Sequence, residues 1–175
     1  MPFGDALGAV NTVLTNVPEA PFVPQLAGED MRKLEVEALE PFIEQCFGPP
    51  VFVKGQVTGP VTYGLLGSGA GHVAKYAAWL EQELKRVGVP TLLFLDEPLL
   101  TWAIEREVPG MREALTEVLE RLTGLKGIHC CAAPPWMLLS SLPVDVISFD
   151  ANTYRVEEPG VRFVERGGTI AWGVI

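Results

Sequence analysis

Short apolar runs alternate with amphipathic stretches along the chain, and this alternation restricts the fold more than any other feature. Most of the runs are apolar on both faces, as expected of parallel strands that are buried on both sides. Six runs are predicted to be strands: Pro21–Leu26, Val51–Thr58, Thr91–Asp96, Gly127–Cys131, Asp145–Asp150 and Thr169–Val174. Apolar residues spaced by three and four predict helices between them, over 7–17, 31–43, 73–87 and 111–122. Repeated strand–helix–strand order predicts an α/β fold with a parallel sheet.

No linker, repeat or low-complexity tract interrupts the pattern, so residues 1–175 are predicted to form one domain. The net charge of −9, from 22 acidic and 13 basic side chains, argues against a nucleic-acid partner. No apolar run is long enough to span a membrane, and no secretory signal is recognisable. Three cysteines, two of them adjacent, suit a reducing cytosol better than a disulfide framework. We therefore expect a cytoplasmic protein without membrane contact.

Polar residues gather where four consecutive predicted strands end. In a parallel barrel, the carboxyl ends of the strands carry the active site, and in a doubly wound sheet they line the crevice. The residues in question are Lys54, Gln56 and Thr58, then Asp96 and Glu97, then His129, Cys130 and Cys131, and finally Ser148 and Asp150. Core packing alone explains such a series poorly. Among them, Gln56 and Thr58 are predicted to contact the substrate.

The segment Gly127–Cys131 predicts half of a zinc site. Strand side chains alternate, so His129 and Cys131 point to one face and Cys130 points to the other. An imidazole and a thiolate on one face supply two ligands of a tetrahedral zinc ion, and Asp150 at the end of the next strand offers a third. Cys46 lies on a predicted helix, which leaves the fourth position open, as a catalytic zinc requires. The competing interpretation is that both cysteines belong to the core.

Asp96 shares a face with the apolar side chains of its own strand. A carboxylate at a strand end can hold a substrate ammonium group by a charge-assisted hydrogen bond. A helix cap or a turn that starts at Pro98 explains the residue equally well. Gly55 and Gly59 bracket the polar end of the preceding strand, where they either let the backbone approach a ligand or form a turn.

Five segments, taken in order, are similar to the catalytic barrel of cobalamin-independent methionine synthase and of its short single-barrel relatives. The uroporphyrinogen decarboxylase barrel is a more distant relative of the same kind. The segments are KGQVTGPVT (54–62), FLDEP (94–98), GIHCC (127–131), VDVISFDA (144–151) and ERGGTIAWG (165–173). The resemblance runs from about Val51 to Ile175 and implies a (β/α) barrel of the TIM type.

The resemblance also implies chemistry for particular residues. It places zinc on His129, Cys131 and Asp150, where the family has a glutamate in the last position, and it makes Asp96 the residue that holds an amino acid's ammonium group. Asp96 and His129 would then be the catalytic residues. The implied reaction transfers a methyl group to a small thiol such as homocysteine, which gives methionine. The methyl donor would be a folate or a methylated corrinoid protein.

The chain also departs from the family. The family's first strand and its last zinc ligand, a cysteine on the final strand, have no counterpart here, so we expect an incomplete barrel of about six of eight strands. Open strand edges then predict a homo-oligomer. Two other functions compete: a uroporphyrinogen decarboxylase-like enzyme, which would need arginines in the cleft, and a non-catalytic binding or assembly protein.

Overall fold

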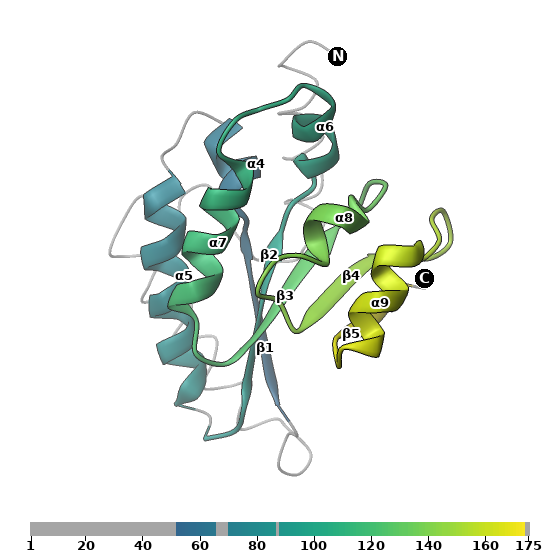
Figure 1. The fold of residues 1–175 in the computed structure, drawn as a ribbon. Coiled ribbons are helices and arrows are strands. Elements are labelled where there is room, and N and C mark those ends of the chain that lie inside the picture. Colours follow the sequence, from purple (N-terminus) through teal and green to yellow (C-terminus); the bar gives the residue numbers. More distant parts are fainter. Residues whose placement is uncertain (1–51, 66–69, 87, 174–175) are drawn as a thin grey trace. The chain divides into compact units, whose positions relative to one another are not determined.

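A computed structural model describes residues 52–65, 70–86 and 88–173, which all belong to one compact unit of the chain. Five strands form one parallel sheet in which spatial order follows chain order (Figure 1). Their bounds are β1 Val53–Thr58, β2 Thr91–Asp96, β3 Leu125–Cys130, β4 Val146–Asp150 and β5 Thr169–Gly173. The predicted α/β class and parallel sheet are confirmed, and a sheet in chain order is consistent with part of a TIM-type barrel.

Every predicted strand within the described ranges is present, with bounds that shift by two residues or fewer at each end. The predicted strand Pro21–Leu26 and the predicted helices over 7–17 and 31–43 lie outside the described residues. The count of six strands and the single domain over residues 1–175 therefore stay predictions.

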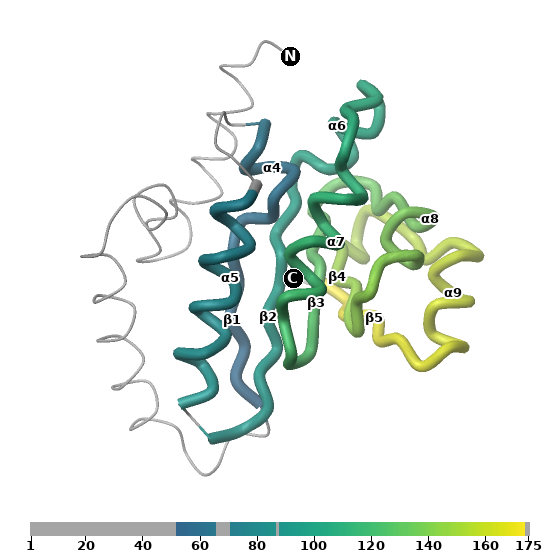
Figure 2. The backbone as a smooth tube through the Cα atoms, turned by 60° about the vertical axis from the view of Figure 1, so that its left-hand side comes forward, coloured from purple at the N-terminus to yellow at the C-terminus, as the bar shows by residue number. Residues whose placement is uncertain are grey.

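Two long helices lie where the spacing of apolar residues predicts them: α5 (Ala70–Lys85) and α7 (Met111–Arg121). They pack against each other, and α5 also packs on β1 and β2 (Figures 1 and 2). Four shorter helices complete the described chain: α4 Pro60–Leu65, α6 Leu100–Glu105, α8 Trp136–Leu139 and α9 Glu158–Glu165. Their four to eight residues are too few to show a clear apolar stripe, which is why the periodicity does not reveal them.

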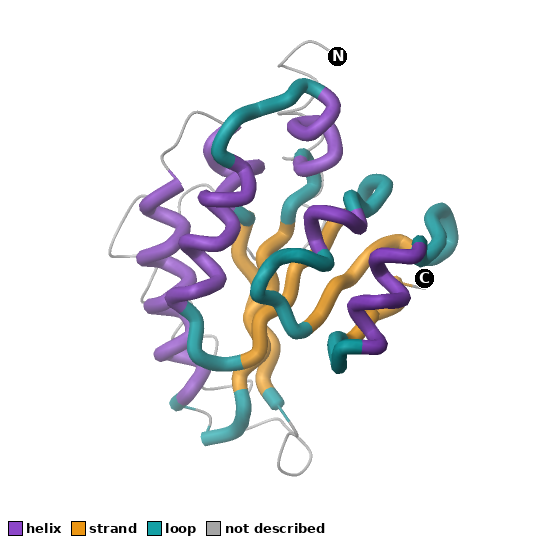
Figure 3. The backbone as a smooth tube through the Cα atoms, in the orientation of Figure 1, coloured by secondary structure: helices purple, strands orange, loops and turns teal. Residues whose placement is uncertain are grey.

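The sheet has one face that packs under helices and one that carries the polar residues. On the helix face, alternate strand residues are fully buried; they include Leu93, Leu95, Ile128, Cys130, Ile147 and Phe149. On the other face, Leu92, Phe94 and Val146 form a smaller apolar cluster with the partly buried Ala171. Helices alternate with strands along the chain (Figure 3). In a barrel, the face away from the helices is the interior, and this face is called the inner face below.

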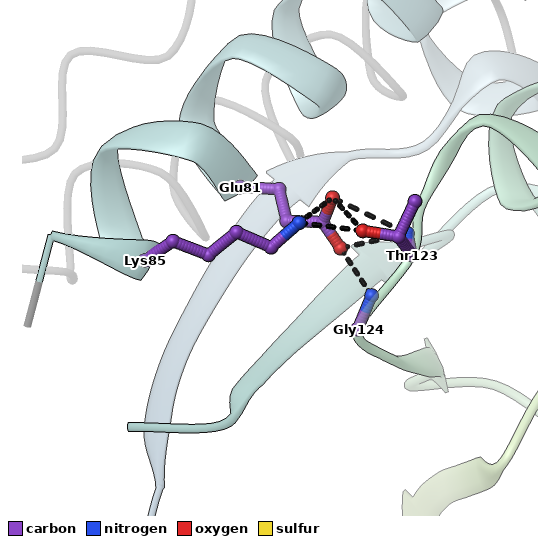
Figure 4. A network of polar contacts seen from close by, with 4 residues as sticks. All are labelled: Glu81, Lys85, Thr123 and Gly124. Carbon is purple, nitrogen blue, oxygen red and sulfur yellow. Dashed lines mark hydrogen bonds and ion pairs between the residues drawn. The ribbon is translucent and has the colours of Figure 1, made fainter. Parts of the chain in front are cut away.

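Glu81 ties helix α5 to the turn before β3, at the amino-terminal end of the sheet (Figure 4). Its buried carboxylate accepts hydrogen bonds from the backbone N–H groups of Thr123 and Gly124, and from the Lys85 ammonium at 3.0 Å. A Cβ at Gly124 would overlap the Thr91 hydroxyl and would come within 3.1 Å of the Glu81 carboxylate, so only glycine fits here without a shift. Burial acts to raise the pKa of Glu81, but the hydrogen bonds from Gly124, Lys85 and Thr123 hold it below its usual range.

None of the helices in the described part of the chain is both long and apolar enough to cross a membrane.

Candidate active site

A row of polar side chains crosses the sheet near the carboxyl ends of its strands. The register pairs Thr58 with Asp96, Asp96 with His129, and His129 with Ser148, so all four lie on the inner face. Thr58 is buried, and the other three are half-buried. Gln56 lies on the same face one step lower, opposite Phe94. The structure therefore brings together the residues of four strand ends, because parallel strands in register present these ends at one edge.

His129 lies between two polar partners. Its Nε2 is 3.0 Å from Cys131 Sγ, and its Nδ1 is 3.1 Å from Ser148 Oγ. Cys130 points the opposite way, where it is fully buried with its sulfur 3.6 Å from the Thr101 hydroxyl. The predicted alternation is confirmed: His129 and Cys131 share a face, and Cys130 belongs to the core under the helices.

The electrostatics of this pair favour its uncharged forms. Burial, and then the charge of Lys54, lower the pKa of His129. Burial, followed by the neighbouring Cys130, Asp96 and Asp150, raises the pKa of the Cys131 thiol. At neutral pH the pair is a neutral imidazole beside a thiol, so it differs from the thiolate–imidazolium pair of cysteine hydrolases.

Asp96 ends β2 on the inner face, where the prediction of a site carboxylate places it. Burial raises its pKa to about 6, against the opposing charge of Lys54. The Lys54 ammonium lies 4.7 Å from the centre of the Phe94 ring, one step below Asp96 along the inner face. Asp96 is therefore a half-buried carboxylate that a cationic ligand group would stabilise.

Glu97, the residue after Asp96, caps a helix. A helix cap was the alternative role that the sequence offered for Asp96. Its carboxylate accepts hydrogen bonds from Val61 N at 2.9 Å, from Thr62 N at 2.8 Å and from the Thr62 hydroxyl at 2.7 Å, all in the first turn of α4. Burial raises the pKa of Glu97 to about 7 in spite of these bonds. The capped helix is α4. The other alternative, a turn that starts at Pro98, is present: Pro98 and Leu99 form a turn in which Leu100 N donates to Glu97 O at 3.2 Å.

The two glycines of the β1 segment make room for protein groups rather than for a ligand. Both lie on the helix face of the sheet. A Cβ at Gly59 would overlap the Glu97 carboxylate, and one at Gly55 would overlap Leu84 and Leu93. Packing against these protein groups is enough to explain both glycines.

The third predicted metal ligand is engaged in its own turn. Asp150 ends β4, and its Oδ1 accepts a hydrogen bond from Asn152 N at 2.9 Å. Hydrogen bonds from the Thr153 hydroxyl and from Asn152 lower the pKa of Asp150. Among residues 52–65, 70–86 and 88–173, no three His, Cys, Asp or Glu side chains are grouped so as to hold a metal ion. Cys46 lies outside these ranges.

The donor set accordingly fits a zinc ion in part. Tetrahedral zinc holds a nitrogen at about 2.0 Å and a sulfur at about 2.3 Å, which places the two donors about 3.5 Å apart. His129 Nε2 and Cys131 Sγ are 3.0 Å apart, so zinc binding requires them to separate by roughly 0.5 Å. The pair is therefore close to a zinc-binding separation, and Asp150 forms no group with it that could hold a metal ion.

Two roles at this edge escape sequence reasoning. Glu97 caps a helix whose first turn is 35 and 36 residues away, and the partnership of Ser148 with His129 depends on the register of β3 and β4. Only the polar character of both residues, next to strand ends, pointed to them.

The fold and the site together define an α/β protein with a parallel sheet and a polar cluster at the carboxyl ends of its strands. No protein-family model matches the chain, and no curated protein matches it. A solved structure with a similar fold is the B12-independent methionine synthase from Shewanella sp. W3-18-1 in complex with selenomethionine. The TM-score is 0.59 at 18% identity, and the match covers 79% of this chain but only 48% of that chain. The likeness supports a methionine-synthase-like fold. This chain spans about half the length of the Shewanella enzyme.

Proposed function

We propose that this chain is part of a methionine-synthase-like barrel that binds zinc through His129 and Cys131 and transfers a methyl group to a small thiol such as homocysteine. The observation that carries the proposal is the 3.0 Å approach of His129 Nε2 to Cys131 Sγ at the carboxyl ends of parallel strands. Zinc favours this pair of donors, and parallel barrels place their chemistry at this edge.

In the proposed site, His129 and Cys131 hold the metal and Asp150 completes the protein ligands. Bound zinc would lower the pKa of a substrate thiol and keep it deprotonated near neutral pH. Asp150 is assigned as the third ligand because it ends β4, the strand that pairs with β3 beside His129. A ligand position remains for the substrate's sulfur.

Asp96 is the proposed residue for the substrate's ammonium group. Its carboxylate lies in the same row as His129, one strand away, and has no cationic hydrogen-bond partner among the described residues. The structure of the Shewanella enzyme contains selenomethionine, an amino acid with such an ammonium group. Gln56 and Thr58, on the neighbouring strand, are proposed to contact the rest of the substrate.

The methyl donor is proposed to be a folate or a methylated corrinoid protein. The described strands β1 to β5 carry no arginine, which weighs against a decarboxylase that binds several carboxylates.

Metal analysis of protein purified without chelator tests the zinc site. We expect near-stoichiometric zinc in the parent, loss of zinc in Cys131→Ser, and retention in Cys130→Ala, the matched control on the opposite face. Absence of zinc in the parent, or equal loss in both variants, would contradict the site.

Methyl transfer to homocysteine, measured with a methylated folate and with a methylated corrinoid, then tests the reaction. Activity that disappears in Cys131→Ser and survives in Cys130→Ala supports a methyltransferase. Bound zinc without transfer from either donor would identify a non-catalytic metal-binding protein.

A further inference from the structure

Ser148 has a position that the sheet itself fixes. It lies in the middle of β4, with His129 opposite on β3 and Ala171 opposite on β5. One torsion angle, χ1, sets the position of the hydroxyl oxygen relative to the backbone. Because neighbouring strands hold the backbone on both sides, the oxygen can occupy only the few positions that the χ1 rotamers allow. That oxygen lies 3.1 Å from His129 Nδ1.

The imidazole of His129 has one partner for each ring nitrogen within the described residues. Ser148 Oγ faces Nδ1, and Cys131 Sγ faces Nε2 at 3.0 Å. A neutral imidazole carries one proton, so one nitrogen donates a hydrogen bond and the other accepts or binds a metal. The partner that accepts the hydrogen bond from the ring N–H therefore determines which nitrogen keeps a free lone pair.

We propose that Ser148 is the positioning residue of His129: its hydroxyl accepts a hydrogen bond from Nδ1–H and so keeps the lone pair of Nε2 directed at Cys131. A hydroxyl can accept from N–H while its own proton points elsewhere, whereas a ring with the proton on Nε2 would turn a donor towards the metal position. Histidine ligands commonly have such an outer partner, which orients the ring and fixes its tautomer. The consequence for zinc rests on the proposed function, but the hydrogen bond itself does not.

Nitrogen-15 NMR of the imidazole rings in the metal-free protein tests the tautomer directly. The chain has two histidines, His129 and the exposed His72 of α5, so His72 serves as an internal reference. We expect His129 of the parent to carry its proton on Nδ1. In Ser148→Ala that preference should be lost, and in Ser148→Thr, which keeps a hydroxyl, it should return.

Ser141→Ala is the matched control. Ser141 is an exposed serine whose hydroxyl contacts Leu138 O and Arg112, so its loss should leave the His129 signals unchanged. A parent protein with the proton on Nε2 overturns the proposal without any variant, and so does a folded Ser148→Ala protein that keeps the parent's tautomer.

Zinc titration separates this inference from the proposed function. If the parent binds zinc, Ser148→Ala should weaken the affinity by about 10- to 100-fold, with recovery in Ser148→Thr. A parent that binds no zinc but shows the Nδ1–H tautomer and its loss in Ser148→Ala would reject the zinc function and leave the role of Ser148 intact. Unchanged zinc affinity in Ser148→Ala would reject the positioning role alone.

Discussion

Asp96 lies in the candidate active site, and its burial lowers the stability of the fold at neutral pH. Its folded-state pKa of about 6 is above the usual value of 3.8, so the fold disfavours the ionised carboxylate at neutral pH. We expect Asp96→Asn to raise the free energy of unfolding at pH 7.5 by roughly 2 kcal/mol. This gain should shrink as the pH falls through 6 towards 4, since the parent's carboxyl then becomes protonated in the fold. Denaturant unfolding at both pH values measures it, and a gain that grows in acid would contradict the buried-carboxylate explanation.

The same residue gives a prediction for binding. If Asp96 holds the substrate's ammonium group, affinity for an amino acid such as methionine should fall as the pH drops below about 6. Below that pH the Asp96 carboxylate becomes protonated and loses the negative charge that attracts the ammonium group. Asp96→Asn should bind weakly at every pH. Calorimetric titration between pH 5 and pH 8 tests this, and an affinity independent of both pH and the substitution would remove Asp96 from the site.

At the level of elements, two glycines near the same helix are expected to respond in opposite ways. A Cβ at Gly59 would displace the Glu97 carboxylate from the first turn of α4, and we expect Gly59→Ala to destabilise the protein by about 1–3 kcal/mol. Gly64 lies in the last turn of α4 with open space around it, so Gly64→Ala should stabilise the protein by about 0.5–1 kcal/mol. Thermal unfolding of the two variants compares them. Equal effects would mean that the cap contributes nothing.

The hydrogen bonds of the Glu81 carboxylate to Thr123, Gly124 and Lys85, here called the Glu81 clamp, give a second prediction at this level. A folded pKa below 4.5 means that the clamp stabilises the fold above that pH and loses its effect as the pH falls through the folded value. Glu81→Gln should lower the free energy of unfolding by about 1–3 kcal/mol at pH 7, and by less at pH 3.5. Glu83→Gln removes an ion pair with Arg86 from a side chain that is 24% exposed, against 1% for Glu81, and should change stability by less than about 1 kcal/mol. A loss at pH 3.5 as large as that at pH 7 would contradict the clamp.

Sequence periodicity revealed the strands and helices that carry a recognisable pattern of apolar residues within their own length. All five described strands and the two long helices could be predicted, because a short apolar run or an apolar stripe along a long helix is visible locally. The row from Thr58 to Ser148 could be anticipated, since parallel strands align their ends. The cap at Glu97, the turn around Asp150 and the partner of His129 could not, because each depends on which groups the fold brings together.

For the whole molecule, the described edge of the sheet supports the expectation of self-association. In the described part of the chain β5 pairs with β4 alone. Trp172 on this strand is 59% exposed, and Val161 and Val164 of α9 are exposed as well. Unpaired strand edges with apolar side chains favour contact with another chain. Light scattering should therefore detect dimers or larger species, and Trp172→Lys should reduce them. Met137→Lys, which removes an exposed methionine from α8 rather than from the strand edge, is the control. A stable monomeric parent would contradict this expectation.

The order β1 to β5 also has a consequence for how the protein is made. Each strand begins 21 to 38 residues after its neighbour in the sheet, at residues 53, 91, 125, 146 and 169. Every strand after β1 can therefore dock on an edge that was synthesised before it. During translation the sheet can grow in the direction of synthesis, and no described strand after β1 has to wait for a later one before it finds a partner.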